Sequence, residues 1–158
     1  PLQWSAVIRE LAARTGLPMV VTGDASEQAL IDEILDDCDG DAISLAGQLG
    51  LGELGAAIKL GSLVIWNNSG PAQIAAAVGT PLVDLYALTS PQHTPWQVEC
   101  RVLFHDVPCR FCQASVCPQG HNDCLRGIMP YRVVDAACGL LARSARMTLK
   151  AMLKRQRG

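Results

Sequence analysis

The segment from Ser62 to Tyr86, SLVIWNNSGPAQIAAAVGTPLVDLY, contains two short apolar runs on either side of an alanine-rich stretch. The apolar runs, residues 62–66 and 81–86, are nearly continuous, which is typical of strands buried on both faces. The alanine-rich stretch follows a turn of polar residues and glycine, and Pro71 stands where a helix start tolerates a missing N–H. The segment therefore predicts a strand, a helix and a second strand parallel to the first.

The same alternation extends to both sides of this segment. Helical spacing of apolar residues predicts helices over residues 4–11, 26–35, 51–60 and from about 131 onward. Further short apolar runs predict strands over residues 18–22, 42–45 and 101–104. Strands of this kind, separated by helices, indicate a doubly wound α/β fold with a parallel sheet covered on both faces.

The length of 158 residues, 49% of them hydrophobic, suits one compact domain. We expect an α/β core over residues 1–106, a cysteine-rich loop over 107–128, and a C-terminal helix with a basic tail over 129–158. The first residues lack the basic start and apolar run of a signal peptide, and no apolar stretch approaches the roughly 20 residues of a membrane span. We expect a cytoplasmic protein whose chain starts at an internal boundary.

The net charge is only −2, but the charges are unevenly distributed. No acidic residue follows Asp135, whereas six basic residues do: Arg143, Arg146, Lys150, Lys154, Arg155 and Arg157. One interpretation is the solvated end of a helix, where cations suit the helix dipole. The other is peripheral attraction to anionic lipid at the inner membrane, worth about 1 kcal/mol per charge. The acidic excess elsewhere and the few aromatic residues argue against nucleic acid as a partner.

The turn before the alanine-rich helix is the first candidate binding site. Small residues on that helix let it lie close to the sheet, and its first N–H groups then face the carboxyl edge of the strands. Ligands of open α/β sheets bind at this edge, and a diphosphate is well matched to free backbone donors and the helix dipole. The alternative is an ordinary turn from strand to helix.

Several motifs resemble the family-9 glycosyltransferases. The stretch NNSGPAQIAAAVGTPLVDLYALTSPQHTPW, residues 67–96, resembles the family's Asp-Ser-Gly-Pro-x-His segment, its Ala-Ala-x-Gly-x-Pro, a strand and a Thr-x-Pro loop. The resemblance continues through VVTGDASEQ (20–28), LAGQLGLGELGAAI (45–58) and the cysteine loop HDVPCRFCQASVCPQGHNDCLRGIMP (105–130), which is similar to that of many lipopolysaccharide heptosyltransferases. It covers nearly the whole chain.

The resemblance implies a GT-B architecture, in which two Rossmann-like domains face each other and the C-terminal one holds the donor, usually ADP-heptose. This chain would be that donor-binding half. The resemblance places Asn68, Ser69 and Gly70 at the donor diphosphate, Glu27 at the ribose hydroxyls and Leu49 beside the base. It adds three further residues to the donor site: Gly23, Pro71 and Gln73. For Glu27 alone, a helix-start carboxylate that stabilises the dipole is the alternative.

Three residues depart from the family pattern. Asn68 replaces the family's Asp, Gln73 replaces its His, and Leu2 stands where a Lys is often found. Each replacement removes a charge or a titratable group beside the donor phosphates. These departures bear on donor identity, on rate and on activity itself.

The implied reaction is transfer of heptose or another sugar from an ADP-sugar to a lipid-linked lipopolysaccharide core acceptor. The general base belongs to the family's N-terminal domain, so we expect no catalytic base here, no cofactor for catalysis, and no activity of this chain alone. Two alternatives are a nucleotide-sugar-binding module that has lost catalysis and a metal-stabilised interaction domain, because fold alone does not determine function.

Four cysteines follow one another with the spacing C-x2-C-x4-C-x6-C: Cys109, Cys112, Cys117 and Cys124. Four thiols so close, with His121 among them, fit a structural zinc or Fe–S site; disulfides and free thiols are the alternatives. We expect the other cysteines to be small buried residues: Cys38, Cys100 and Cys138. His93 either faces the donor sugar or lies in an exposed loop.

Overall fold

The computed structural model describes residues 1–87, 94–112, 114 and 116–155, so the predicted position of His93 lies outside the described residues. Its helices are α1 (Leu2–Thr15), α2 (Gln28–Asp36), α3 (Leu51–Leu60), α4 (Gly70–Val78), α5 (Asp123–Arg126) and α6 (Pro130–Arg155), with a 3-10 turn η1 (Ala25–Glu27) before α2. Its strands are β1 (Met19–Val21), β2 (Ala42–Ser44), β3 (Val64–Asn67), β4 (Leu82–Leu85) and β5 (Cys100–Leu103). Each predicted helix and strand is present, and α5 is an addition within the cysteine-rich loop.

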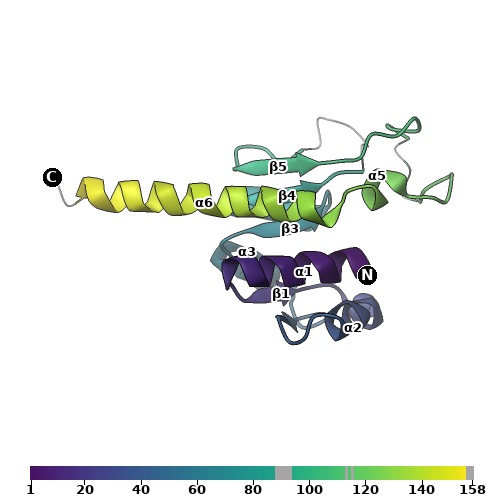
Figure 1. Ribbon diagram of the computed structural model, residues 1–158, viewed down its shortest axis with the longest axis horizontal. Helices are drawn as coiled ribbons and strands as arrows, with labels where there is room; N and C mark the ends of the chain where they lie inside the picture. Colours follow the sequence, from purple (N-terminus) through teal and green to yellow (C-terminus); the bar gives the residue numbers. More distant parts are fainter. Residues whose placement is uncertain (88–93, 113, 115, 156–158) are drawn as a thin grey trace.

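Within the described residues, the strand pairs are all parallel, as predicted. The strands form two hydrogen-bonded groups, β1 with β2, and β3 with β4 and β5. Figure 1 shows the strands of the two groups in the spatial order β1, β3, β4, β5. Helices α1 and α6 run in the same direction as each other. The doubly wound arrangement is therefore present, although the ladder is divided between β1 and β3.

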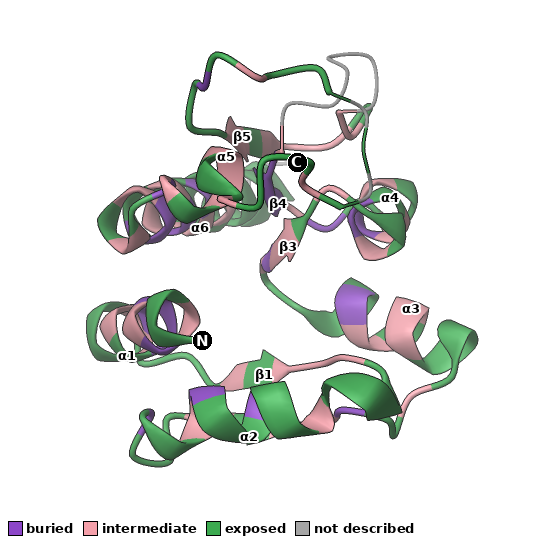
Figure 2. Ribbon diagram, turned by 90° about the vertical axis from the view of Figure 1, so that its right-hand side faces the viewer, coloured by how far each residue is buried: buried purple, intermediate pink, exposed green. Residues whose placement is uncertain are grey.

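Strand β4 is buried on both faces, which explains its nearly continuous apolar sequence. Because successive strand residues face opposite sides, Val83 and Leu85 pack into a core with α1 and α6. Leu82 packs into a second core with α3, β3 and α4. Figure 2 shows α1 and α6 on one side of the strands and α3 and α4 on the other.

Helix α4 approaches the sheet closely through two alanines. Ala72 and Ala75 are completely buried in the core that contains Leu82. Ala76 is half-buried and Ala77 is exposed. Only two of the four alanines in this helix therefore make the close contact with the sheet that was expected of its small residues. The helix ends at Gly79, whose φ of 80° is the left-handed conformation that glycine adopts most readily.

Helix α6 extends well beyond the core. Its first half contributes four buried residues to the core with α1 and β4: Val133, Val134, Ala137 and Leu140. Ala145 continues the apolar spacing of this half but is exposed. Figure 1 shows the later part of α6 running past the end of the sheet. Although α6 is 26 residues long, neither it nor another helix in the described ranges has the length and apolar character that crossing a membrane requires.

Candidate functional site

The turn that joins β3 to α4, residues 67–70, is open to solvent at its end; we call it the β3–α4 turn. Ser69 precedes the helix in an extended conformation, and Ser69 and Gly70 are exposed. Within the described residues, the N–H groups of Ser69 and Gly70 have no hydrogen-bond acceptor. A side-chain carbon added at Gly70 would meet nothing within 4 Å. The turn therefore offers backbone donors and the positive end of a helix dipole, a combination that binds anions.

Asn68 is held in this turn by two contacts to β4. Its backbone N–H donates to the Leu85 carbonyl at 3.0 Å, and its side-chain Nδ2 donates to Asp84 Oδ2 at 2.8 Å. Thus Asn68, which the resemblance placed at the donor diphosphate, directs its amide at least partly toward the protein. Pro71 is half-buried and Gln73 is exposed in the first turns of α4.

Asp84 is the polar residue that the sequence analysis missed. It is completely buried, and its Oδ1 has no hydrogen-bond partner among the described residues. Burial raises the pKa of the Asp84 carboxyl, and the hydrogen bond from Asn68 partly opposes that rise. The signal was present in the sequence, because an acid within the apolar run of residues 81–86 requires a partner or a function.

A second group of predicted residues lies after β1 and β2. Glu27 Oε2 accepts a hydrogen bond from the Asp24 N–H at 3.0 Å, which closes a capping box at η1. Glu27 Oε2 therefore acts as the helix-start carboxylate that was the alternative interpretation of this residue. Its other oxygen, Oε1, has no hydrogen bond within the described residues. A side-chain carbon at Gly23 would lie 2.7 Å from Glu27 Oε2, so a larger residue at position 23 would displace the carboxylate.

The turns after β1 and β2 are joined to each other. The Gly47 N–H donates to the Gly23 carbonyl at 2.9 Å, and Leu49 is half-buried two residues further on. Both sets of predicted residues follow the carboxyl ends of parallel strands, β1 and β2 in one group and β3 in the other. Open α/β sheets bind ligands at this kind of edge. Figure 2 views the molecule toward this edge.

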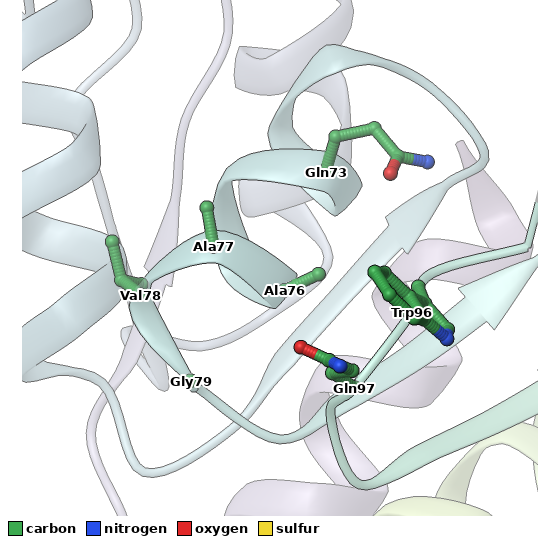
Figure 3. A pocket seen from close by; sticks show the side chains of 7 residues that line it. All are labelled: Gln73, Ala76, Ala77, Val78, Gly79, Trp96 and Gln97. Atoms are coloured by element: carbon green, nitrogen blue, oxygen red, sulfur yellow. The ribbon is translucent and has the colours of Figure 1, made fainter.

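An open pocket of about 550 Å³ runs along the outer side of α4. Figure 3 shows Gln73 at one end of the pocket and Trp96 opposite Ala76 across it. The Trp96 side chain is 78% exposed, which is unusual for so large an apolar residue. The pocket lies beside α4 and the residues around Trp96, and it was not anticipated from the sequence.

The cysteine-rich loop does not form the predicted metal site. Cys109 Sγ lies 3.7 Å from His121 Nε2, but Cys112 is exposed. In the parts of the chain that the structure describes, no three His, Cys, Asp or Glu side chains are grouped so that they could hold a metal ion. The zinc interpretation of Cys109, Cys112, Cys117 and Cys124 therefore has no support, because sequence spacing alone does not make the four sulfur atoms converge.

The thiols of this loop nevertheless differ in their surroundings. Backbone N–H groups, foremost that of Asn122, lower the pKa of the Cys117 thiol. Burial raises the pKa of Cys124. All seven cysteines are free: Cys38 is buried as predicted, whereas Cys100 and Cys138 are only partly buried against the cores.

Comparisons with known proteins agree with this arrangement. The profile described as glycosyltransferase family 9 (heptosyltransferase) matches residues 2–122. Lipopolysaccharide heptosyltransferase 3 from Escherichia coli is 41% identical over 98 residues, which are 60% of this chain and 28% of that protein. The chain is thus much shorter than this relative.

Two solved structures share the fold. The glycosyl transferase family 9 protein from Veillonella parvula DSM 2008 superposes with a TM-score of 0.77 at 26% identity, over 90% of this chain and 42% of that one. The E. coli ADP-heptose LPS heptosyltransferase II gives a TM-score of 0.72 at 26% identity, over 92% and 42% of the two chains. These likenesses confirm the predicted Rossmann-like α/β fold, and the profile match over most of the sequence shows that the chain belongs to glycosyltransferase family 9.

Proposed function

We propose that this chain is the donor-binding half of a GT-B glycosyltransferase that transfers heptose, or another sugar, from an ADP-sugar to a lipopolysaccharide core acceptor. The observation that carries the proposal is the open β3–α4 turn, where the N–H groups of Ser69 and Gly70 lack an acceptor among the described residues. Family membership supports the reaction class, and one of the solved structures that share the fold is an ADP-heptose LPS heptosyltransferase.

In this proposal the turn binds the donor diphosphate and stabilises the leaving group. The acceptor oxygen bonds the sugar carbon while the bond from that carbon to the diphosphate oxygen breaks, and its electron pair leaves with ADP. Negative charge then grows on the diphosphate, where the free N–H groups and the dipole of α4 stabilise it. The scheme uses no cofactor.

The other predicted residues bind the nucleoside. Glu27 Oε1, which is not used in the capping box, accepts from the ribose hydroxyls, and Leu49 lies beside the base. Gly23 leaves room for the Glu27 carboxylate, and Pro71 and Gln73 complete the first turns of α4. The base that activates the acceptor belongs to the other domain of the GT-B enzyme, so this chain by itself should bind donor without transferring sugar.

We also propose a cytoplasmic location at the inner face of the membrane, where the lipid-linked acceptor would be met. The exposed end of α6 supports this proposal. Its described part carries five cations after Asp135 and no acid, together with four exposed apolar side chains: Met147, Leu149, Met152 and Leu153. Such a helix end suits an anionic lipid surface.

Titration with ADP tests the central proposal. Gly70→Val adds a branched side chain at a position where the added Cβ would meet nothing within 4 Å, so the fold should persist while the side chain keeps a phosphate away. We expect saturable ADP binding in isothermal titration calorimetry and a loss of at least tenfold in the variant, about 1.4 kcal/mol.

The matched control is Gly139→Val in α6, a helical glycine with equally open surroundings that lies outside the turns after β1, β2 and β3. It should bind ADP like the unmodified protein. Absence of saturable ADP binding, or equal losses in both variants, would contradict the proposal and favour an interaction domain.

A catalytically inactive nucleotide-sugar-binding module is the second candidate. The observation that favours it is the engagement of Asn68 with Asp84, where the family pattern has an acid at position 68. Both candidates predict ADP binding. Sugar transfer by the intact enzyme to a lipopolysaccharide core acceptor separates them, because the module would bind the donor and release it unchanged.

A further inference from the structure

We propose that Asp84 is a positioning residue for the nucleotide diphosphate: it anchors Asn68 and thereby presets the β3–α4 turn. The inference rests on the proposed function, since it names a residue that prepares the same turn for ADP. Asp84 itself lies behind the turn, in β4, and makes no contact with the ligand.

The burial of Asp84 is the first argument. Its neighbours Leu82, Val83 and Leu85 are all buried apolar residues, and Asp84 has no exposed surface. An apolar side chain would serve the core better, because a buried carboxyl with only one of its oxygens bonded is unfavourable. The Asp84 carboxyl therefore lowers the stability of the folded state, which indicates that its role lies outside the core.

The second argument is the geometry of the contact. Asp84 pairs in register with Trp66, so its carboxyl lies one strand away from the point where β3 turns toward α4. From there it accepts the Asn68 side chain at 2.8 Å, while the Asn68 backbone N–H bonds Leu85 at 3.0 Å. Asn68 is thus fixed at two points, immediately before the two N–H groups that lack acceptors among the described residues. A turn fixed before binding loses less conformational entropy when ADP binds.

The third argument concerns charge. The side chain nearest the predicted phosphates, Asn68, is an uncharged amide. The carboxyl group of Asp84 lies behind the turn, in β4. Burial raises the pKa of the Asp84 carboxyl, and the hydrogen bond from Asn68 partly opposes that rise. The titratable group facing Asp84 from β5 is Cys100; burial, followed by the Asp84 charge, raises the pKa of its thiol to about 11, so it stays neutral.

Two substitutions, combined as a swap, test the inference in the intact protein. Asn68→Asp places two carboxyl groups where one donor and one acceptor now meet, and should weaken ADP binding at least tenfold. Asn68→Asp combined with Asp84→Asn restores one donor and one acceptor with the acid at position 68, as in the family pattern. We expect the double variant to bind ADP at least about threefold more tightly than Asn68→Asp, because the donor and acceptor pair is restored, and more weakly than the unmodified protein, because the carboxyl at position 68 then lies beside the phosphates.

Asp84→Leu separates positioning from stability. It replaces the buried acid with an apolar side chain, so the melting temperature should stay equal or rise, while ADP affinity should fall at least tenfold because Asn68 loses its anchor. If this variant does not fold, the swap comparison decides alone.

The inference is overturned if the double variant binds ADP no better than Asn68→Asp, or if a folded Asp84→Leu binds it normally. Failure of the unmodified protein to bind ADP would instead refute the proposed function, and the positioning role with it. The two failures are distinguished by the first titration.

Discussion

At the scale of single residues, Asp84 and Glu27 show how a carboxylate takes its role from its surroundings. Glu27 is exposed and caps η1 with one oxygen, so the other oxygen remains available to a ligand. Asp84 is buried and bonds Asn68, so it acts only through that neighbour. Both acids were visible in the sequence, but only the packing around each determines which one can touch a ligand.

The raised pKa of Asp84 makes a prediction about stability and pH. The folded state holds this proton more tightly than the unfolded chain does, so the free energy of unfolding is highest below the ordinary Asp pKa. It falls as the pH rises from that value to the raised one, by at most about 1.4 kcal/mol per pH unit. Asp84→Asn cannot ionise and should lose less stability over this range.

Urea unfolding of both proteins between pH 4 and pH 8 measures the difference. The matched control is Asp32→Asn on the exposed side of α2, which removes an exposed carboxyl and leaves Asp84 in place. Identical pH profiles for all three proteins would show that Asp84 does not titrate as proposed.

At the scale of elements, helix α4 connects the core to the site. Its buried alanines let the helix lie against β3 and β4, and this contact sets where the β3–α4 turn projects. The sequence predicted the helix and its closeness to the sheet. It did not distinguish Ala75, which is completely buried, from Ala77, which is exposed, because four alanines in six residues leave no clear periodicity.

This difference within α4 can be tested directly. Ala75→Leu forces extra methylene groups into a filled core and should cost about 1–3 kcal/mol. The melting temperature should fall by about 2–4 °C for each kcal/mol in a domain of this size. Ala77→Leu, the control on the exposed side of the same helix, should leave it nearly unchanged; equal losses in the two variants would contradict the assigned packing.

At the scale of the whole molecule, α6 divides into a packed half and a projecting half. The packed half forms the core with α1 and β4, and Figure 1 shows the other half running past the strands. Cations and large apolar side chains of this projecting half are exposed. Arg143 is partly neutralised by Glu99 at 3.1 Å. Lys150 and Lys154 lie further along the helix and are exposed.

Vesicle binding tests the proposed role of this helix end. Lys150→Gln with Lys154→Gln should weaken binding to anionic lipid vesicles about thirtyfold, because each cation near such a surface contributes about 1 kcal/mol. Arg9→Gln with Lys59→Gln removes two exposed cations from other helices and should have a smaller effect. Equal cosedimentation with neutral and anionic vesicles would rule out the proposed attraction.

The sequence by itself determined the order of the elements, their parallel arrangement and the turn before α4, because burial of a strand or a helix leaves a local periodicity in the residues. Only the tertiary structure decided that Asn68 meets Asp84, 16 residues away, and that the loop cysteines do not converge on a metal. It also decided that α6 runs past its core. These outcomes depend on strand register and on the distances between elements, and a pattern within one element contains neither.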